Sequence, residues 1–189
     1  MALILFDTNI FIDMLNGVKQ ATAELTHYDK PAISVITYME LRAGEREHEK
    51  ALLDAVLAEF EIIQIDQRVT DVAIEIRKRS LAVPPKVKLP DAIIGATAKV
   101  HHIPLVTRNP SDFVDRGIRV HVPYDFDSAT GKVTNVREPA STERRIAITG
   151  LSQFQSFEPF AQFTFELAEY RPVSPKGIGA YVKAIKKPR

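Results

Sequence analysis

Short apolar runs alternate with longer segments of helical periodicity along the first 124 residues. The apolar runs have the length and the β-branched content of buried strands and lie at residues 2–6, 32–36, 62–65, 104–107 and 118–122. Between them, apolar residues recur at i, i+3 and i+4, which predicts helices at 10–15, 18–27, 37–44, 45–60, 66–76 and 90–98. Strands that alternate with helices pair in parallel. The pattern therefore predicts a three-layer α/β/α domain with a central, mainly parallel sheet.

The pattern changes after Tyr124. Residues 127–132 are rich in turn formers, and residues 145–149 and 163–167 alternate as strands do. Five of the ten phenylalanines lie within residues 154–165. We therefore predict one domain over residues 1–124 and a β-rich C-terminal extension over residues 125–189 that contains a β-hairpin.

Composition limits the classes of protein to consider. Hydrophobic residues make up 45% and charged residues 26% of the 189 residues, as in ordinary soluble domains. The absence of cysteine excludes disulfides, thiolate zinc sites and cysteine nucleophiles. No apolar stretch approaches the roughly 20 residues that span a bilayer, and the first residues lack the basic region of a signal peptide. These features predict a cytoplasmic protein.

The net charge of +1 conceals an asymmetry. Residues 1–129 carry 15 Lys and Arg against 19 Asp and Glu, whereas residues 130–189 carry 10 against 5. An acidic body with a basic end indicates two regions with different roles.

Four acidic residues follow strands or open helices. Asp7 directly follows the first strand, Glu40 follows the second, Asp91 opens a helix, and Asp112 follows the fourth strand together with Asn109. Each also has a local explanation. Asp7 could cap a helix, and Glu40 could close a capping box with the threonine three residues earlier. Asp91 could complement a helix dipole, and Asp112 could brace a turn.

Considered together, the four acids indicate a site. In a parallel α/β layer helices begin on the side where strands finish, so these side chains can converge on one edge. Several acids at one edge repel each other unless a cation is bound. Oxygen ligands suit Mg²⁺ or Mn²⁺, and such ions assist phosphodiester hydrolysis. Lys86, Lys88 and Arg108 lie near the acids and could hold a polyanion, or could be ordinary solvated charges.

Four motifs, in this order, resemble the PIN-domain family, and in particular the VapC-type toxins of prokaryotic toxin–antitoxin pairs. They are LFDTNIFID at residues 5–13, TYMELRAG at 37–44, LPDAIIGATA at 89–98 and LVTRNPSDF at 105–113. The resemblance covers about residues 1–124 and implies an Mg²⁺- or Mn²⁺-dependent endoribonuclease, usually a homodimer held inactive by a cognate antitoxin.

The resemblance also implies roles for individual residues. Asp7, Glu40 and Asp91 match the acidic cluster of the family, with Asp7 and Asp91 as the expected direct metal ligands. Thr8 or Asn9 would help to position the site. The fourth acidic position is open, because Asn109 stands where the family often has an acid and Asp112 lies three residues later. One or two metal ions could therefore bind.

Two further alternatives stay open from the sequence. The extension over residues 125–189 could be an accessory hairpin packed on the domain, a basic aromatic surface for RNA, or a segment that contacts the antitoxin or a second subunit. With Asn109 at the fourth position, the chain could also be a PIN-like protein with impaired catalysis that binds RNA or a partner.

Overall fold

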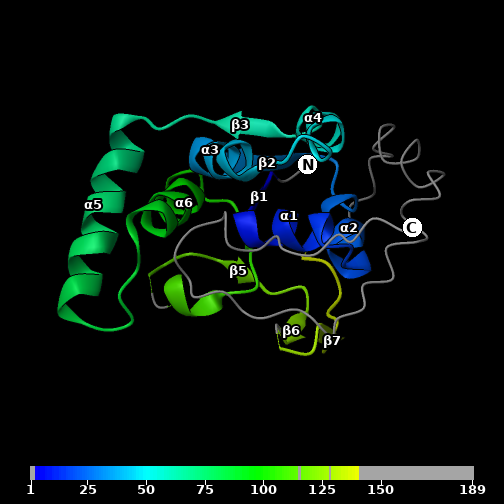
Figure 1. The fold of residues 1–189 in the computed structure, drawn as a ribbon. Coiled ribbons are helices and arrows are strands. Elements are labelled where there is room, and N and C mark those ends of the chain that lie inside the picture. The colour runs from blue at the N-terminus through cyan, green and yellow to red at the C-terminus, as the bar shows by residue number, and fades with distance from the viewer. Residues whose placement is uncertain (1–2, 115, 128, 141–189) are drawn as a thin grey trace, which may run out of the picture.

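Strand β1 (Ile4–Phe6) lies in the middle of the fold, and all three of its residues are buried. The computed structural model describes residues 3–114, 116–127 and 129–140. Five parallel strands form one sheet in the order β3-β2-β1-β4-β5 (Figure 1). The other four strands are β2 (Pro31–Ser34), β3 (Glu61–Ile63), β4 (Leu105–Val106) and β5 (Val120–His121). This sheet confirms the predicted α/β/α fold class.

Helices cover both faces of the sheet because the strand residues alternate in direction. Ile4 and Phe6 pack in a cluster with residues of α1 (Thr8–Leu15), α2 (Lys19–Leu25) and α4 (Lys50–Leu57), and Leu41 of the third helix joins this cluster. Leu5 packs on the opposite face with residues of α6 (Leu89–Val100). Helix α5 (Gln67–Ala82) packs against α6. In this way the buried core holds β1 from both sides.

Helix α3 (Val35–Gly44) begins two residues earlier than the sequence pattern predicts. The prediction that a strand continues to Ile36 is therefore wrong, as is the prediction that Thr37 opens the helix. The cause is a cap at Ser34, whose side-chain oxygen accepts a hydrogen bond of 3.3 Å from the amide of Ile36. The β-branched residues Val35 and Ile36 concealed this start, because they are also typical of strands.

Other predicted boundaries also differ, and α5 extends to Ala82, beyond the predicted end at residue 76. The helix predicted over residues 45–60 is the shorter α4, because the amide of Arg46 donates to the Glu49 carboxylate at 2.9 Å in a turn before it. Asp66 caps α5 as predicted, accepting a hydrogen bond of 2.8 Å from the amide of Val69. Among the described residues, no helix is long and apolar enough to cross a membrane.

A two-stranded antiparallel hairpin follows the main sheet. It consists of β6 (Asp125–Asp127) and β7 (Lys132–Thr134), and Phe126 and Val133 pack against the core around β1. The domain boundary at Tyr124 stays a prediction. The strands predicted over residues 145–149 and 163–167, the phenylalanine cluster and the basic end lie outside the described residues.

Candidate active site

The carboxyl ends of β1 and β4 meet around Asp7. The backbone amide of Asp7 donates to the carbonyl of Val106 at 3.0 Å and that of Thr107 to the carbonyl of His121 at 3.0 Å, so the sheet pairing extends beyond the strand ends. Asp7 is buried and starts α1, but its carboxylate makes no capping hydrogen bond to that helix. The cap explanation for Asp7 therefore fails, and its carboxylate is held by other groups.

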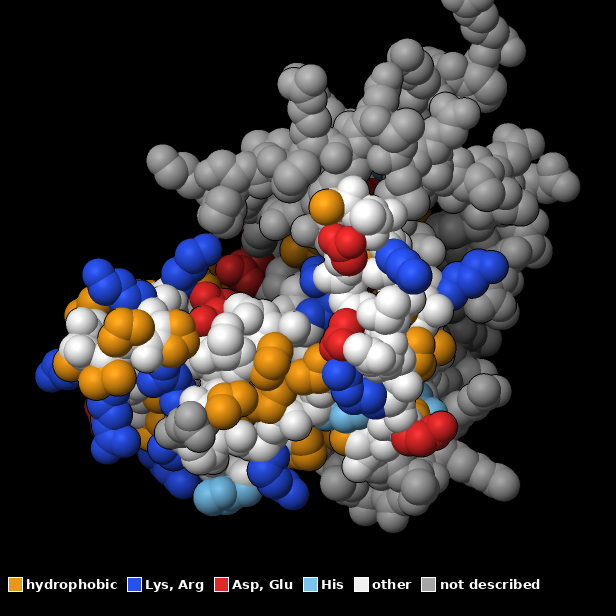
Figure 2. All heavy atoms as spheres, turned by 90° about the horizontal axis from the view of Figure 1, so that it is seen from below, with side chains coloured by type: hydrophobic (Ala, Val, Ile, Leu, Met, Phe, Trp, Pro, Cys, Tyr) orange, Lys and Arg blue, Asp and Glu red, His pale blue; other side chains and the backbone are white. Residues whose placement is uncertain are grey.

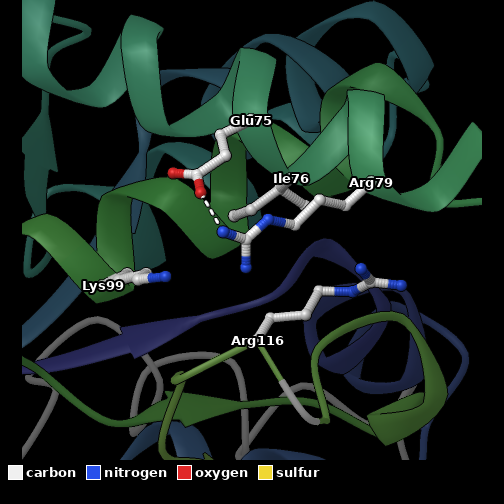
Figure 3. A pocket seen from close by; sticks show the side chains of 5 residues that line it. All are labelled: Glu75, Ile76, Arg79, Lys99 and Arg116. Atoms are coloured by element: carbon white, nitrogen blue, oxygen red, sulfur yellow. Dashed lines mark ion pairs between the residues drawn. The ribbon is translucent and has the colours of Figure 1, made fainter.

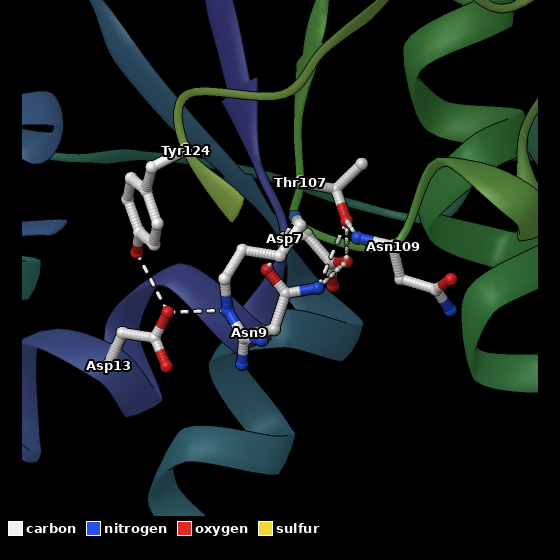
Figure 4. Close-up of polar contacts among 7 residues, drawn as sticks. Asp7, Asn9, Asp13, Thr107, Asn109 and Tyr124 are labelled. Atoms are coloured by element: carbon white, nitrogen blue, oxygen red, sulfur yellow. Dashed lines mark hydrogen bonds and ion pairs between the residues drawn. The ribbon is translucent and has the colours of Figure 1, made fainter. Parts of the chain in front are cut away.

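Two side chains from different elements orient the Asp7 carboxylate (Figure 4). The Thr107 hydroxyl donates to Oδ2 of Asp7 at 2.6 Å, and the Asn9 amide nitrogen donates to the same oxygen at 2.6 Å. Asn9 also donates to the Thr107 oxygen at 2.9 Å, and its own oxygen accepts from the amide of Arg108 at 3.2 Å. The amide of Asn109 completes the shell by donating to the Thr107 oxygen at 3.0 Å.

These contacts use every hydrogen-bonding position of the Thr107 hydroxyl, which offers one donor and two acceptors. Together they orient the Thr107 hydroxyl, and the two donors at Oδ2 orient the Asp7 carboxylate. The sequence analysis did not single out Thr107. Thr107 lies within the LVTRN motif. Its importance comes from its contact with Asp7, 100 residues away in sequence, which local patterns do not reveal.

Glu40 lies on α3 and turns toward α1, where Oε2 accepts a hydrogen bond of 2.5 Å from the Thr8 hydroxyl. The capping-box alternative fails, because α3 begins at Val35 and Ser34 is its cap. Thr37 is fully buried, and its hydroxyl has no hydrogen-bond partner within the described part of the chain. Thr8 is thus the residue that positions Glu40.

Asp91 and Asp112 form the other side of the site. Asp91 lies in the first turn of α6, as predicted, and Asp112 ends a short 3-10 helix over Pro110–Asp112. The Asn109 amide donates to the Asp112 carboxylate at 2.5 Å. Gly95 of α6 allows this turn to approach closely, because a Cβ there would lie 2.9 Å from Ile118 and 3.1 Å from the Phe113 ring.

The pKa values of these acids report their proximity. Burial, with a further contribution from the charges of Asp91 and Glu40, raises the pKa of Asp7 to about 7, against the lowering effect of the hydrogen bond from Thr107. Burial, followed by the charges of Asp112 and Glu40, raises the pKa of Asp91 to about 6. The pKa of Asp112 is also raised by burial. Asp7, Glu40 and Asp91 therefore interact electrostatically at one edge of the sheet, and the charge of Asp112 acts on Asp91.

The oxygen donors fit a hard divalent cation in type and in charge, since a bound cation would offset this repulsion. Within the described residues, however, no three Asp, Glu, His or Cys side chains are gathered as a ready-made metal site. The Glu40 carboxylate accepts a hydrogen bond from Thr8, and the Asp112 carboxylate accepts one from Asn109. Such neutral donors stabilise carboxylates that would otherwise repel each other. A pair of carboxylates is still sufficient for Mg²⁺, which keeps waters and substrate oxygens as further ligands.

The predicted cationic residues differ in their surroundings. Lys88 precedes α6, and its charge lowers the pKa of both Asp91 and Asp112, so it lies near the acids. Lys86 is exposed in the preceding loop. Arg108 forms an ion pair with buried Asp13, and its guanidinium lies 4.9 Å from the centre of the Phe126 ring. Arg108 therefore joins the hairpin to the site, an arrangement that the sequence did not reveal.

Asp13 is the centre of this second polar cluster (Figure 4). It also accepts a hydrogen bond of 2.7 Å from the hydroxyl of Tyr124, and burial raises its pKa to about 6 despite the nearby Arg108 charge. The sequence analysis missed Asp13, whose position within an apolar helix was the one available signal.

Comparisons with known proteins show which family this chain matches. A family model described as PIN domain matches residues 4–116. A solved toxin–antitoxin complex from Klebsiella pneumoniae is 38% identical with a TM-score of 0.56, and the match covers 65% of this chain and 99% of that one. FitAcB from Neisseria gonorrhoeae is 26% identical with a TM-score of 0.54, over 64% of this chain and 97% of that one.

DNA-bound VapBC from Salmonella typhimurium shares the fold, with 24% identity, a TM-score of 0.54 and coverage of 64% of this chain and 98% of that one. A comparison with curated proteins found no significant match. The chain therefore belongs to the PIN-domain family, as its four motifs predicted, and its resemblance is to the VapC-type toxins.

Proposed function

We propose that this protein is an Mg²⁺- or Mn²⁺-dependent endoribonuclease and the toxin of a type II toxin–antitoxin system. The observation that carries the proposal is the gathering of carboxylates at one edge of the sheet, where Asp91 and Glu40 act on Asp7 and Asp112 acts on Asp91, with Asp7 held by Thr107 and Asn9. The similarity to the toxin–antitoxin complex from Klebsiella supports the toxin assignment. By the same reasoning we propose a cognate antitoxin as partner, a homodimer as the assembly and the cytoplasm as its location.

In this mechanism Asp7 and Asp91 would hold the cation, and Glu40 would bind it or orient the attacking water. A divalent ion bound there would lower the pKa of a water molecule and stabilise the charge that develops on the phosphate. Thr8 keeps Glu40 turned toward the site, while Asn9 and Thr107 keep the Asp7 carboxylate in one orientation. Lys86 and Lys88 contact the RNA backbone, with Arg108 as a further candidate contact.

For the fourth acidic position we propose Asp112 rather than Asn109. After burial, the charge of Asp112 makes the largest contribution to the raised pKa of Asp91. The Asn109 amide orients the Asp112 carboxylate. Asn109 would then be a positioning residue.

The test is cleavage of a mixed-sequence RNA by the full chain with Mn²⁺ and with EDTA. We expect cleavage with Mn²⁺ only, and loss of cleavage to background in Asp7→Asn with an unchanged circular dichroism spectrum. Undiminished cleavage by folded Asp7→Asn would overturn the mechanism. RNA binding by the wild type without cleavage in Mn²⁺ would favour the alternative of a PIN-like binding protein with impaired catalysis.

A further inference from the structure

A small hollow lies between α5, α6 and the segment after the Asp112 turn (Figure 3). It has a volume of about 30 Å³ and is lined by five residues, namely Glu75, Ile76, Arg79, Lys99 and Arg116. Three of the five are cationic and one is acidic. We infer that this hollow binds a backbone phosphate of the RNA, at a distance from the cleaved bond, an inference that rests on the proposed endoribonuclease activity.

The charges around the hollow are incompletely balanced. Glu75 forms an ion pair with Arg79, which neutralises that pair. Arg116 donates from Nε to the carbonyl of Asp112 at 2.9 Å and from Nη2 to the carbonyl of Pro85 at 3.3 Å. These carbonyls orient the guanidinium, which forms no ion pair within the described residues, although its charge also acts on the Asp112 carboxylate. Part of its positive charge therefore stays available to an anion.

Lys99 supplies the second uncompensated charge. It is half-buried, and no carboxylate of the described chain forms an ion pair with it. Its ammonium lies against Gly117, with Nζ 3.7 Å from the position that a Cβ would occupy there. A half-buried ammonium without a counter-ion gains free energy when an anion binds beside it.

The size of the hollow selects the kind of group. A hollow of about 30 Å³ has room for only a few water-sized groups and is too small for an aromatic base. Phosphate oxygens fit such a hollow, and contacts to phosphate fix the position of a strand without reading its sequence. The site would therefore strengthen RNA binding and extend the length of RNA that is held, with no preference for a base.

The hollow is joined to the catalytic edge along two routes. Lys99 follows Asp91 by eight residues on the same helix, which is about 12 Å along the helix axis. Arg116 contacts the carbonyl of Asp112, and its charge lowers the pKa of that side chain. At about 3.4 Å per nucleotide of a stacked strand, the hollow lies roughly three to four nucleotides from the acids. Figure 2 shows further Lys and Arg side chains gathered at the end of the molecule that α5 occupies.

The experiment measures binding of a labelled 12-nucleotide RNA to the full chain in EDTA, which keeps binding separate from cleavage. We expect Lys99→Gln to raise the dissociation constant about fivefold at 0.1 M salt and to reduce the slope of log K against log salt by about 0.7. Lys99→Arg should restore binding. Lys50→Gln is the matched control, because Lys50 is exposed on α4, on the opposite face of the sheet.

A second variant changes affinity in the other direction. Glu75→Gln removes the one acid among the described residues that line the hollow, and it releases Arg79 from its ion pair. This variant should therefore bind RNA more tightly, a gain that misfolding cannot produce.

Cleavage gives a second measurement. With Mn²⁺, Lys99→Gln should raise KM for the 12-nucleotide RNA with little change in kcat, and leave cleavage of a trinucleotide unaffected. Unchanged binding and salt slope in both Lys99→Gln and Glu75→Gln would overturn the phosphate site, whatever the cleavage assay reports.

Discussion

At the scale of single residues, a neutral hydroxyl sets the orientation of the central acid. Thr107 donates to Asp7 and accepts from Asn9 and from the amide of Asn109. Groups that orient a metal-binding carboxylate typically contribute 10- to 100-fold to activity or metal affinity. Thr107 is thus expected to matter although it takes no direct part in the chemistry.

Thr107→Val keeps the shape of the side chain and removes the hydroxyl. We expect about a 10- to 100-fold loss of kcat with Mn²⁺ and a higher Mn²⁺ requirement, because Asp7 loses one of its two side-chain donors. Thr107→Ser is the control and should retain most activity. Equal Mn²⁺ titrations for the valine variant and the wild type would argue against this positioning role.

The raised pKa of Asp7 predicts how stability depends on pH. Its value is about 7 in the folded protein against 3.8 for an ordinary aspartate, so the folded state binds the proton more tightly. The associated stability is present below pH 4 and is lost as the pH rises toward 7. In EDTA, the free energy of unfolding of the wild type should fall by about 2 to 4 kcal/mol more than that of Asp7→Asn between pH 4 and pH 8.

Urea titrations at a series of pH values measure this difference. Asp7→Asn should be the more stable protein at pH 8 and lose its advantage at pH 4. Parallel stability profiles would mean that the charge of Asp7 costs nothing at neutral pH, contrary to its burial beside Asp91 and Glu40.

At the scale of elements, Ser34 determines where α3 begins and hence where Glu40 points. Ser34→Ala removes the cap and should lower the free energy of unfolding by about 1 kcal/mol. Glu40→Gln should leave stability nearly unchanged at low pH, since Glu40 caps nothing. Urea titration measures both losses. A loss of stability in Glu40→Gln equal to that in Ser34→Ala would support the alternative that Glu40 closes a capping box.

The sequence predicted the secondary-structure elements better than it predicted the contacts between them. The parallel sheet and most helices follow from periodicity, since burial of β1 on both faces demands a continuous apolar run. The start of α3 was misjudged because Val35 and Ile36 suit strands as well as helices. The motifs identified the acids, but Thr107, Thr8 and Tyr124, which donate to Asp7, Glu40 and Asp13, lie 32 to 111 residues from these acids in sequence. Such contacts follow from topology rather than from local pattern.

At the scale of the whole molecule, cation binding should be visible as stability. An ion that binds only the folded chain stabilises it by about 2.7 kcal/mol at 100 times its dissociation constant. For a protein of this size, such a gain corresponds to a rise in Tm of roughly 5 to 10 °C. We expect this rise with Mn²⁺ in the wild type, a much smaller one in Asp7→Asn and none with K⁺. Equal rises in both proteins, measured by calorimetry, would place the cation elsewhere.

The long separation between Asp7 and Thr107 has a consequence for how the protein is made. The hydrogen bond between them joins residues 100 positions apart, and Asp112 lies later still. Because translation proceeds from the amino end, Asp7 leaves the ribosome long before its donor exists. A chain that ends before Asp112 therefore cannot assemble the edge that holds the four acids. With the proposed nuclease activity, the protein would stay inactive until that part of the domain has been made.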